Sequence, residues 1–136
     1  MGFLSGAVPN PAIDKAFSEG LANGGYLENR DAIIERKWAY NQPGDLPRLV
    51  RELIERGVAV IATSGGAPTA LAAKAATTTI PIVALTGDDP VRLGLVKSMN
   101  RPDGNVTGVS FLSTQLESKR LGLVHELLPQ ASIVGL

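Results

Sequence analysis

The stretch VAVIATSGGAPTALAAKAATTTIPIVALTGDDP, residues 58–90, decides the fold class of this 136-residue chain. It contains short, continuous apolar runs at 58–62 and 80–85, and each run is followed by a turn of small polar residues. Continuous apolar runs of this length are typical of parallel strands that are covered by helices on both faces. The stretch therefore predicts neighbouring strands of a parallel sheet, each leading into a helix.

The remaining sequence continues the same alternation of strand and helix. Further strands are predicted at 2–4, 32–38, 106–111 and 132–136, and helices at 12–22, 44–57, 64–77, 90–99 and 114–128. Polar and apolar residues alternate along 32–38, which places that strand nearer an edge of the sheet than the later strands. This pattern predicts the α/β class, with a doubly wound, mostly parallel sheet.

Three of the predicted helices begin at capping signals. Ser64 precedes the alanine-rich helix, Asp89 precedes a proline, and Thr114 is followed three residues later by Glu117. Side-chain oxygens at such positions accept hydrogen bonds from the free N–H groups of a first helical turn. Each of the three signals therefore predicts the start of a helix.

The composition excludes several classes of function. Basic and acidic residues number 13 each, so no net charge attracts the chain to nucleic acid or to an anionic membrane. No apolar run approaches the roughly 20 residues that span a bilayer. The chain has no cysteine, which excludes disulfides and thiolate metal sites, and its one histidine, His125, has no second ligand nearby in the sequence. We therefore expect neither a metal nor a cofactor.

The turn after the 58–62 run is the first candidate ligand site. Free backbone N–H groups at a helix N-terminus attract anions, so Ser64 and Gly65 are placed to hold a ligand carboxylate, with the Thr63 and Ser64 hydroxyls adding hydrogen bonds. The alternative is that Ser64 only caps the helix, and both roles can hold together.

The turn after the 80–85 run, Thr86-Gly87-Asp88, is the second candidate. Asp88 is placed to pair with a ligand ammonium or hydroxyl group, whereas Asp89 is expected to cap the following helix. The alternative for Asp88 is a solvated carboxylate. If both turns bind, they hold the two charged ends of a zwitterion, which fits an amino-acid ligand.

Two further positions are weighed at the same edge of the predicted sheet. Ser5 and Gly6 follow the first strand, and Gly6 permits a close approach of the backbone; the alternative is an ordinary turn. Trp38 and Tyr40 follow the second strand, where one ring stacks on a ligand in the functional interpretation. In the other interpretation Trp38 packs beneath the following loop.

Enzymatic activity is not expected. A dehydrogenase requires a G-x-G-x-x-G turn and a hydrolase a G-x-S-x-G turn, and neither motif occurs. The first strand ends in Leu4-Ser5-Gly6, without the acids of a phospho-receiver. A binding module is therefore predicted, and a sensory or regulatory domain of the same fold stands as the alternative.

A set of motifs, in order along almost the whole chain, resembles one protein family. They are Phe3-Leu4-Ser5-Gly6, Arg36-Lys37-Trp38-Ala39, Ile61-Ala62-Thr63-Ser64-Gly65-Gly66, Thr77-Thr78-Thr79-Ile80-Pro81-Ile82-Val83, Thr86-Gly87-Asp88-Asp89-Pro90, Leu93-Gly94-Leu95-Val96 and residues 100–110, NRPDGNVTGVS. Together they resemble the substrate-binding proteins of bacterial ABC transporters, in the subfamily with tryptophan/tyrosine-type members.

The resemblance implies a periplasmic-binding-protein type I fold, in which two Rossmann-like lobes close on a small ligand that a membrane permease receives. Residues 1–110 correspond to the N-terminal ligand-binding lobe, and 111–136 to the crossover helix and first strand of a second, truncated lobe. The expected ligand is an amino acid or small aromatic acid, and the expected location is periplasmic. The sequence departs from the family pattern in three ways. The second lobe is missing, a leader with an anchoring cysteine is missing, and residues 23–26 carry an extra glycine where the family has a shorter turn.

The C-terminal segment leads to a prediction about assembly. Residues 116–128 and 133–136 form a large apolar surface without the neighbours that a parallel strand needs on both faces. The chain is therefore interpreted as a fragment, or as a protein completed by a partner chain. We expect a homodimer through the C-terminal helix and strand.

Overall fold

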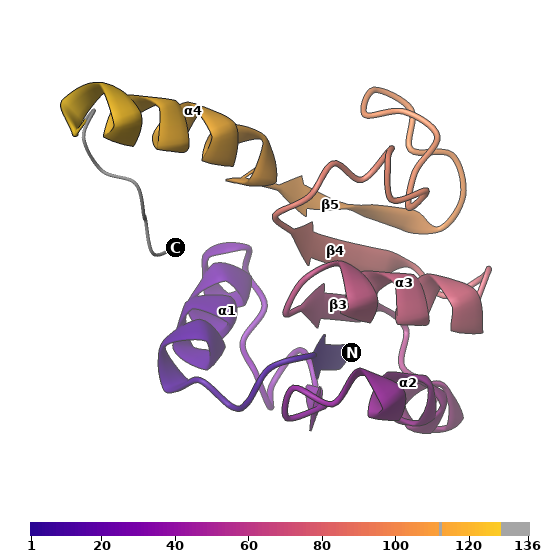
Figure 1. The fold of residues 1–136 in the computed structure, drawn as a ribbon. Coiled ribbons are helices and arrows are strands. Elements are labelled where there is room, and N and C mark those ends of the chain that lie inside the picture. The colour runs from indigo at the N-terminus through magenta and orange to yellow at the C-terminus, as the bar shows by residue number, and fades with distance from the viewer. Residues whose placement is uncertain (112, 129–136) are drawn as a thin grey trace.

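The computed structural model describes residues 1–111 and 113–128. A five-stranded sheet forms its centre, in the order β2-β1-β3-β4-β5 (Figure 1). The strands are β1 (Gly2–Ser5), β2 (Glu35–Trp38), β3 (Ile61–Ser64), β4 (Ile82–Thr86) and β5 (Val106–Ser110). Every neighbouring pair is parallel, so all carboxyl ends lie at one edge. The predicted α/β class with a doubly wound, parallel sheet is confirmed.

The strand order reverses direction at β1. The chain runs from β1 outward to the edge strand β2, and then crosses to β3 on the opposite side of β1. In doubly wound sheets, ligands bind beyond the carboxyl ends of the strands at such a switch point. The carboxyl ends of β1 and β3 are therefore the first place to look for a site.

One face of the sheet is covered by α2 (Leu46–Glu55) and α3 (Ala67–Ala76), which also pack on each other. Helix α2 follows a 3-10 turn, η1 (Pro43–Asp45), and its apolar residues recur at the spacing of one helical face. Ala70 and Ala73 of α3 are completely buried, because their small side chains allow the helix to approach the sheet closely. The buried core lies between these helices and the strand residues Leu4, Ile61 and Ile82.

The opposite face carries α1 (Pro11–Asn23) and is only partly covered. Asn10 caps this helix through its side chain, and the Phe17 ring packs on the Phe3 ring with centroids 4.8 Å apart. Toward β4 and β5 the sheet is open, with Val83 42% and Val109 57% exposed. The result is an apolar groove of about 410 Å³ between α1 and this half of the sheet.

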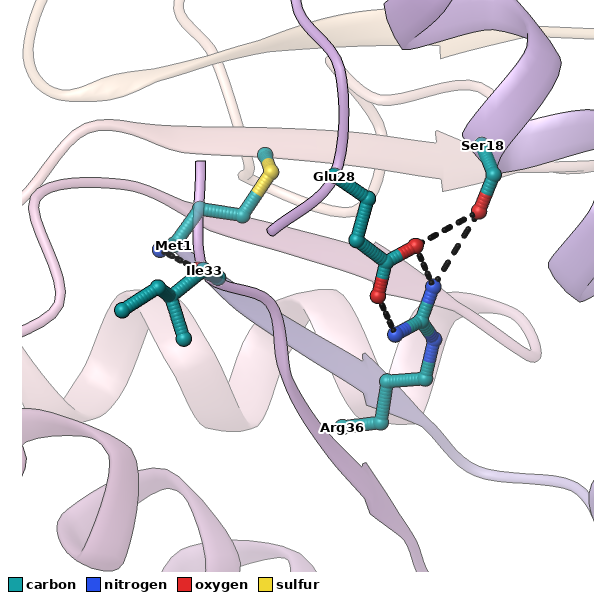
Figure 2. A network of polar contacts seen from close by, with 5 residues as sticks. All are labelled: Met1, Ser18, Glu28, Ile33 and Arg36. Carbon is teal, nitrogen blue, oxygen red and sulfur yellow. Dashed lines mark hydrogen bonds and ion pairs between the residues drawn. The ribbon is translucent and has the colours of Figure 1, made fainter. Parts of the chain in front are cut away.

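Polar contacts fasten the edge strand β2 to the rest of the molecule. Figure 2 shows the Arg36 guanidinium of β2 paired with both oxygens of Glu28, while Ser18 of α1 donates to Glu28 at 3.0 Å. The Arg36 hydrogen bonds lower the pKa of Glu28 from 4.5 to about 2, against the opposing effect of burial. Nearby, the Met1 amino group donates to the Ile33 carbonyl oxygen at 2.6 Å.

Most predicted elements are confirmed in kind and order, with shifted ends. The strand expected at 58–62 is β3 and begins three residues later, and the strand expected at 80–85 is β4, at Ile82–Thr86. The strand expected at 32–38 is β2, at one edge of the sheet, and so lies nearer an edge than β3 and β4; β5 forms the other edge, where the prediction did not place it. The strand expected at 132–136 lies outside the described residues.

The predicted helix at 90–99 is wrong. Asp89 does accept hydrogen bonds from the Val91 and Arg92 amides, as a cap would, but the chain makes only a single turn. Gly94, at φ +67°, ends it by donating to the Val91 carbonyl, while Leu95 donates to the Pro90 carbonyl. The cap signal was correct, and a helix-terminating glycine followed it too closely for a helix to form.

The start of the last helix differs by one residue from the position that the Thr114 signal predicted. Helix α4 begins at Ser113 and runs to Leu127, so Thr114 already lies inside the first turn. In Figure 1, α4 projects away from the carboxyl end of β5. None of the helices among the described residues is both long and apolar enough to cross a membrane.

Candidate functional site

The predicted site turns meet at the carboxyl edge of the sheet. Ser5 and Ser64 are paired in register at the ends of β1 and β3, and Thr86 ends β4 on the far side of β3. The parallel topology brings together three turns that are far apart in sequence. The residues that end the three strands, Ser5, Ser64 and Thr86, are all buried, so the turns that follow them carry the accessible groups of this edge.

The β1 and β3 turns touch at the switch point through their glycines. The Gly6 amide donates to the Ser64 carbonyl oxygen at 3.1 Å. A Cβ on Gly65 would lie 2.6 Å from the Gly6 nitrogen, and a Cβ on Gly6 would lie 2.6 Å from Thr69 Oγ1. Gly65 also has φ +87°, which side chains disfavour. Both glycines are required by close approach of the two turns.

The start of α3 corrects the prediction for Ser64. Ser64 is the last residue of β3 and is buried, and the N-cap position belongs to Gly66. No side chain caps the helix there, because Gly65 and Gly66 at positive φ lengthen the turn before Ala67. Ser64 as a helix cap is therefore wrong, and the first-turn N–H groups of α3 have no side-chain cap.

The β4 turn is held by hydroxyl groups. Thr86 Oγ1 accepts from the Asp88 amide at 3.1 Å. The Ser110 hydroxyl donates to the Asp88 carbonyl oxygen at 2.6 Å, and the Ser113 hydroxyl donates to the Gly87 carbonyl oxygen at 3.3 Å. The Asp88 side chain is half-buried at this edge, within the row of turns.

Buried hydroxyls also lie behind the β3 turn. Thr63, 3% exposed, and Thr69, 0% exposed, have hydroxyl oxygens without a hydrogen-bond partner among the described residues. Sequence reasoning named Thr63 as a hydroxyl that reaches ligand, whereas the structure places its side chain inside the molecule. It missed Thr69, whose position in the first turn after a double-glycine turn was the available signal.

The aromatic candidates are placed differently. Trp38 is half-buried at the end of β2, in register with Ser5. Tyr40 is 57% exposed at φ +50°, and the next residue, Asn41, donates its amide to the Gly6 carbonyl oxygen at 2.8 Å. Tyr40 therefore stands in the loop beside the Ser5–Gly6 turn, with its ring accessible from solvent.

The chemistry of this edge is that of recognition by hydrogen bonds. Its groups are serine and threonine hydroxyls, backbone amides and one carboxylate. Ser5 is buried, and its hydroxyl oxygen accepts from the Ala7 amide at 3.3 Å. Within residues 1–111 and 113–128, no three His, Cys, Asp or Glu side chains lie together in a way that could hold a metal ion.

Comparison with known proteins identifies the family. A family model described as "ABC transporter substrate binding protein" matches residues 6–136. The chain belongs to this family. The resemblance seen in the sequence motifs is thereby confirmed.

Individual relatives agree with that assignment. A protein named tyrosine-binding protein from Clostridioides difficile (strain R20291) is 35% identical over 97% of this chain and 38% of its own length. Of the solved structures, a conserved domain protein from Vibrio cholerae O1 has a TM-score of 0.79 at 31% identity, covering 95% of this chain and 44% of its own. This member of the ABC substrate-binding family thus shares its fold with both.

Two solved relatives are described by their ligand state. An ABC domain in complex with L-Trp from Streptococcus pneumonia has a TM-score of 0.72 at 28% identity, covering 80% of this chain and 37% of its own. A ligand-free, open substrate-binding protein with adhesive properties from Clostridium difficile has the same TM-score and identity, covering 96% and 44%. The family member described here therefore spans less than half the length of these relatives.

Proposed function

We propose that this chain supplies the N-terminal lobe, residues 1–110, of the solute-binding component of a bacterial ABC importer. Residues 111–136 would begin a second lobe. The observation that carries the proposal is the 35% identity to a tyrosine-binding protein over 97% of the chain, with polar turns gathered at the switch point. A permease as partner and a periplasmic location follow from this role.

The proposed ligand is an amino acid, and an aromatic one in particular. Relatives are named or described with tyrosine and L-Trp. The uncapped N-terminus of α3 offers backbone N–H groups and a helix dipole to a carboxylate, together with the hydroxyls of Ser5 and Ser64. Asp88 offers a carboxylate to the ammonium group. No group at this edge has a nucleophile and base arrangement, and we propose binding without chemistry.

The test is a titration of the uniformly ¹⁵N-labelled chain with L-tyrosine and L-tryptophan, followed by NMR. Amide shifts at residues 5–7, 64–67, 69–70 and 86–88 are expected at millimolar ligand, since one wall of a two-lobed cleft binds weakly. Absence of shifts with both amino acids, or shifts confined to α1 and α2, would contradict the proposed site.

Asp88→Asn tests the ammonium contact. We expect L-tyrosine affinity to fall about tenfold, which corresponds to about 1.4 kcal/mol. N-acetyl-L-tyrosine has no ammonium group, so it should bind the variant and the wild type equally. Asp103→Asn is the matched control, since Asp103 pairs with Lys97 on the surface at 2.5 Å. Equal losses for both ligands would point to a damaged turn instead of a lost ion pair.

Self-association is the remaining part of the proposal. The leucines of α4 are exposed, namely Leu116, Leu121, Leu123 and Leu127, and Leu128 follows them. A helix with so much uncovered apolar surface is stabilised by a partner surface. We place the homodimer contact on this helix.

A further inference from the structure

Three consecutive carbonyl groups of the β4 turn accept hydrogen bonds from one short segment, residues 110–113. The Phe111 amide donates to the Thr86 oxygen at 3.0 Å, Ser113 Oγ to the Gly87 oxygen at 3.3 Å, and Ser110 Oγ to the Asp88 oxygen at 2.6 Å. This segment connects β5 to α4. Each residue of the turn that carries Asp88 is therefore hydrogen-bonded to the end of β5 or the start of α4.

The fit between turn and crossover is close. A Cβ on Gly87 would lie 2.5 Å from Ser113 Oγ, so a side chain at 87 would displace the Ser113 hydroxyl from its place against the turn. Gly87 is not among the glycines at positive φ, so this contact is what distinguishes the position. The serine hydroxyl occupies the place that a side chain would take.

The other turns at this edge are held differently. The Ser5 and Gly6 carbonyls accept from the Ala39 and Asn41 amides, and the Ser64 carbonyl accepts from the Gly6 amide. These bonds join backbone groups and involve no side-chain hydroxyl. Only in the β4 turn, among the described turns of the site, do side chains from a neighbouring segment hold the carbonyls, so its position depends on which residues stand at 110 and 113.

We propose that Ser110 and Ser113 are positioning residues of the candidate ligand site. Their hydroxyls hold the Thr86–Asp88 turn against the end of β5 and the start of α4, so that a ligand bound on this turn also orders the start of α4. The ligand part of this inference rests on the proposed function; the fastening of the turn does not. A single hydroxyl hydrogen bond contributes little to overall stability, so losing both leaves the fold intact and the turn mobile.

The first measurement needs no ligand. Amide hydrogen exchange is followed by NMR in the 136-residue chain for the wild type, Ser113→Ala and Ser110→Ala/Ser113→Ala. The Asp88 and Phe111 amides should exchange about tenfold faster in the double variant, corresponding to about 1.4 kcal/mol, with amides of β1 and β3 unchanged. Ser110→Thr keeps the hydroxyl, so the Asp88 amide should exchange as slowly in this variant as in the wild type. Unchanged exchange at both amides in the folded variants would overturn the inference.

The second measurement is the L-tyrosine affinity of the same variants. The affinity should fall at least fivefold in the double variant and should equal that of the wild type in Ser110→Thr. Thr107→Ala is the matched control, because Thr107 is an exposed hydroxyl residue of the same strand. Unchanged affinity in the double variant would overturn the positioning role. If the wild type binds neither L-tyrosine nor L-tryptophan, the proposed function fails, and the exchange rates still decide whether the serines hold the turn. If the double variant does not fold, Ser113→Ala alone is read in the same way.

Discussion

At the scale of single residues, Gly108 shows how closely β4 and β5 approach. A Cβ at this position would lie 1.9 Å from the Ala84 carbonyl oxygen, and the residue has φ +156°. Gly108→Ala must therefore separate the two strands. We expect it to lower the free energy of unfolding by more than about 3 kcal/mol, measured by urea denaturation.

Gly20→Ala is the control for that substitution. Gly20 lies inside α1 with open space where its Cβ would be, so alanine should stabilise the chain by about 0.5–1 kcal/mol through helix propensity. A Gly108→Ala variant within about 0.5 kcal/mol of the wild type would contradict the strand geometry described here.

At the scale of elements, the Glu28–Arg36 pair determines how the attachment of β2 depends on pH. The pKa of Glu28 is about 2 in the folded chain against an ordinary 4.5, so the ionised form is favoured by folding. Its stabilisation is present above pH 4.5 and is lost as the pH falls toward 2. Glu28→Gln should cost about 1–2 kcal/mol at pH 7, and the difference from wild type should shrink across that window.

The measurement is urea unfolding of both proteins between pH 7 and pH 2.5. Taking the difference between them cancels the titration of the other carboxylates. Glu19→Gln is the control, since Glu19 pairs with Lys15 at 3.6 Å on an exposed surface, where such pairs contribute less than about 0.5 kcal/mol. A Glu28→Gln difference that is constant with pH would show that the ion pair does not stabilise the fold.

At the scale of the whole molecule, the exposed leucines of α4 lead to a prediction about assembly. We expect the wild type to dimerise at tens of micromolar, an order of magnitude set by ordinary association energies. Leu123→Glu/Leu127→Glu should give a monomer, because both side chains are exposed and a buried carboxylate is costly. Light scattering coupled to size exclusion measures both. The control is Val8→Glu, an exposed apolar residue in the loop between β1 and α1, and a wild-type monomer at this concentration would contradict the proposal.

The fold was largely predictable because its signals are local. The apolar runs that became β3 and β4, and the one-sided apolar spacing of α2, are properties of a few adjacent residues. The helix expected at 90–99 failed because one local signal overrode another: Gly94 ends the turn that the Asp89 cap begins. Lys74 of α3 also donates to the Leu95 carbonyl oxygen at 3.1 Å, a contact between distant segments that no local pattern shows.

The sequence by itself determined the class of sheet and the polar turns that end its strands. Tertiary structure decided which turns meet, since the strand order sets Gly6 against Gly65. It also decided that Thr63 and Thr69 are buried, and that Ser110 and Ser113 hold the turn carrying Asp88. Hydrogen bonds and burial between distant segments depend on how the elements pack, and no short stretch of sequence contains that information.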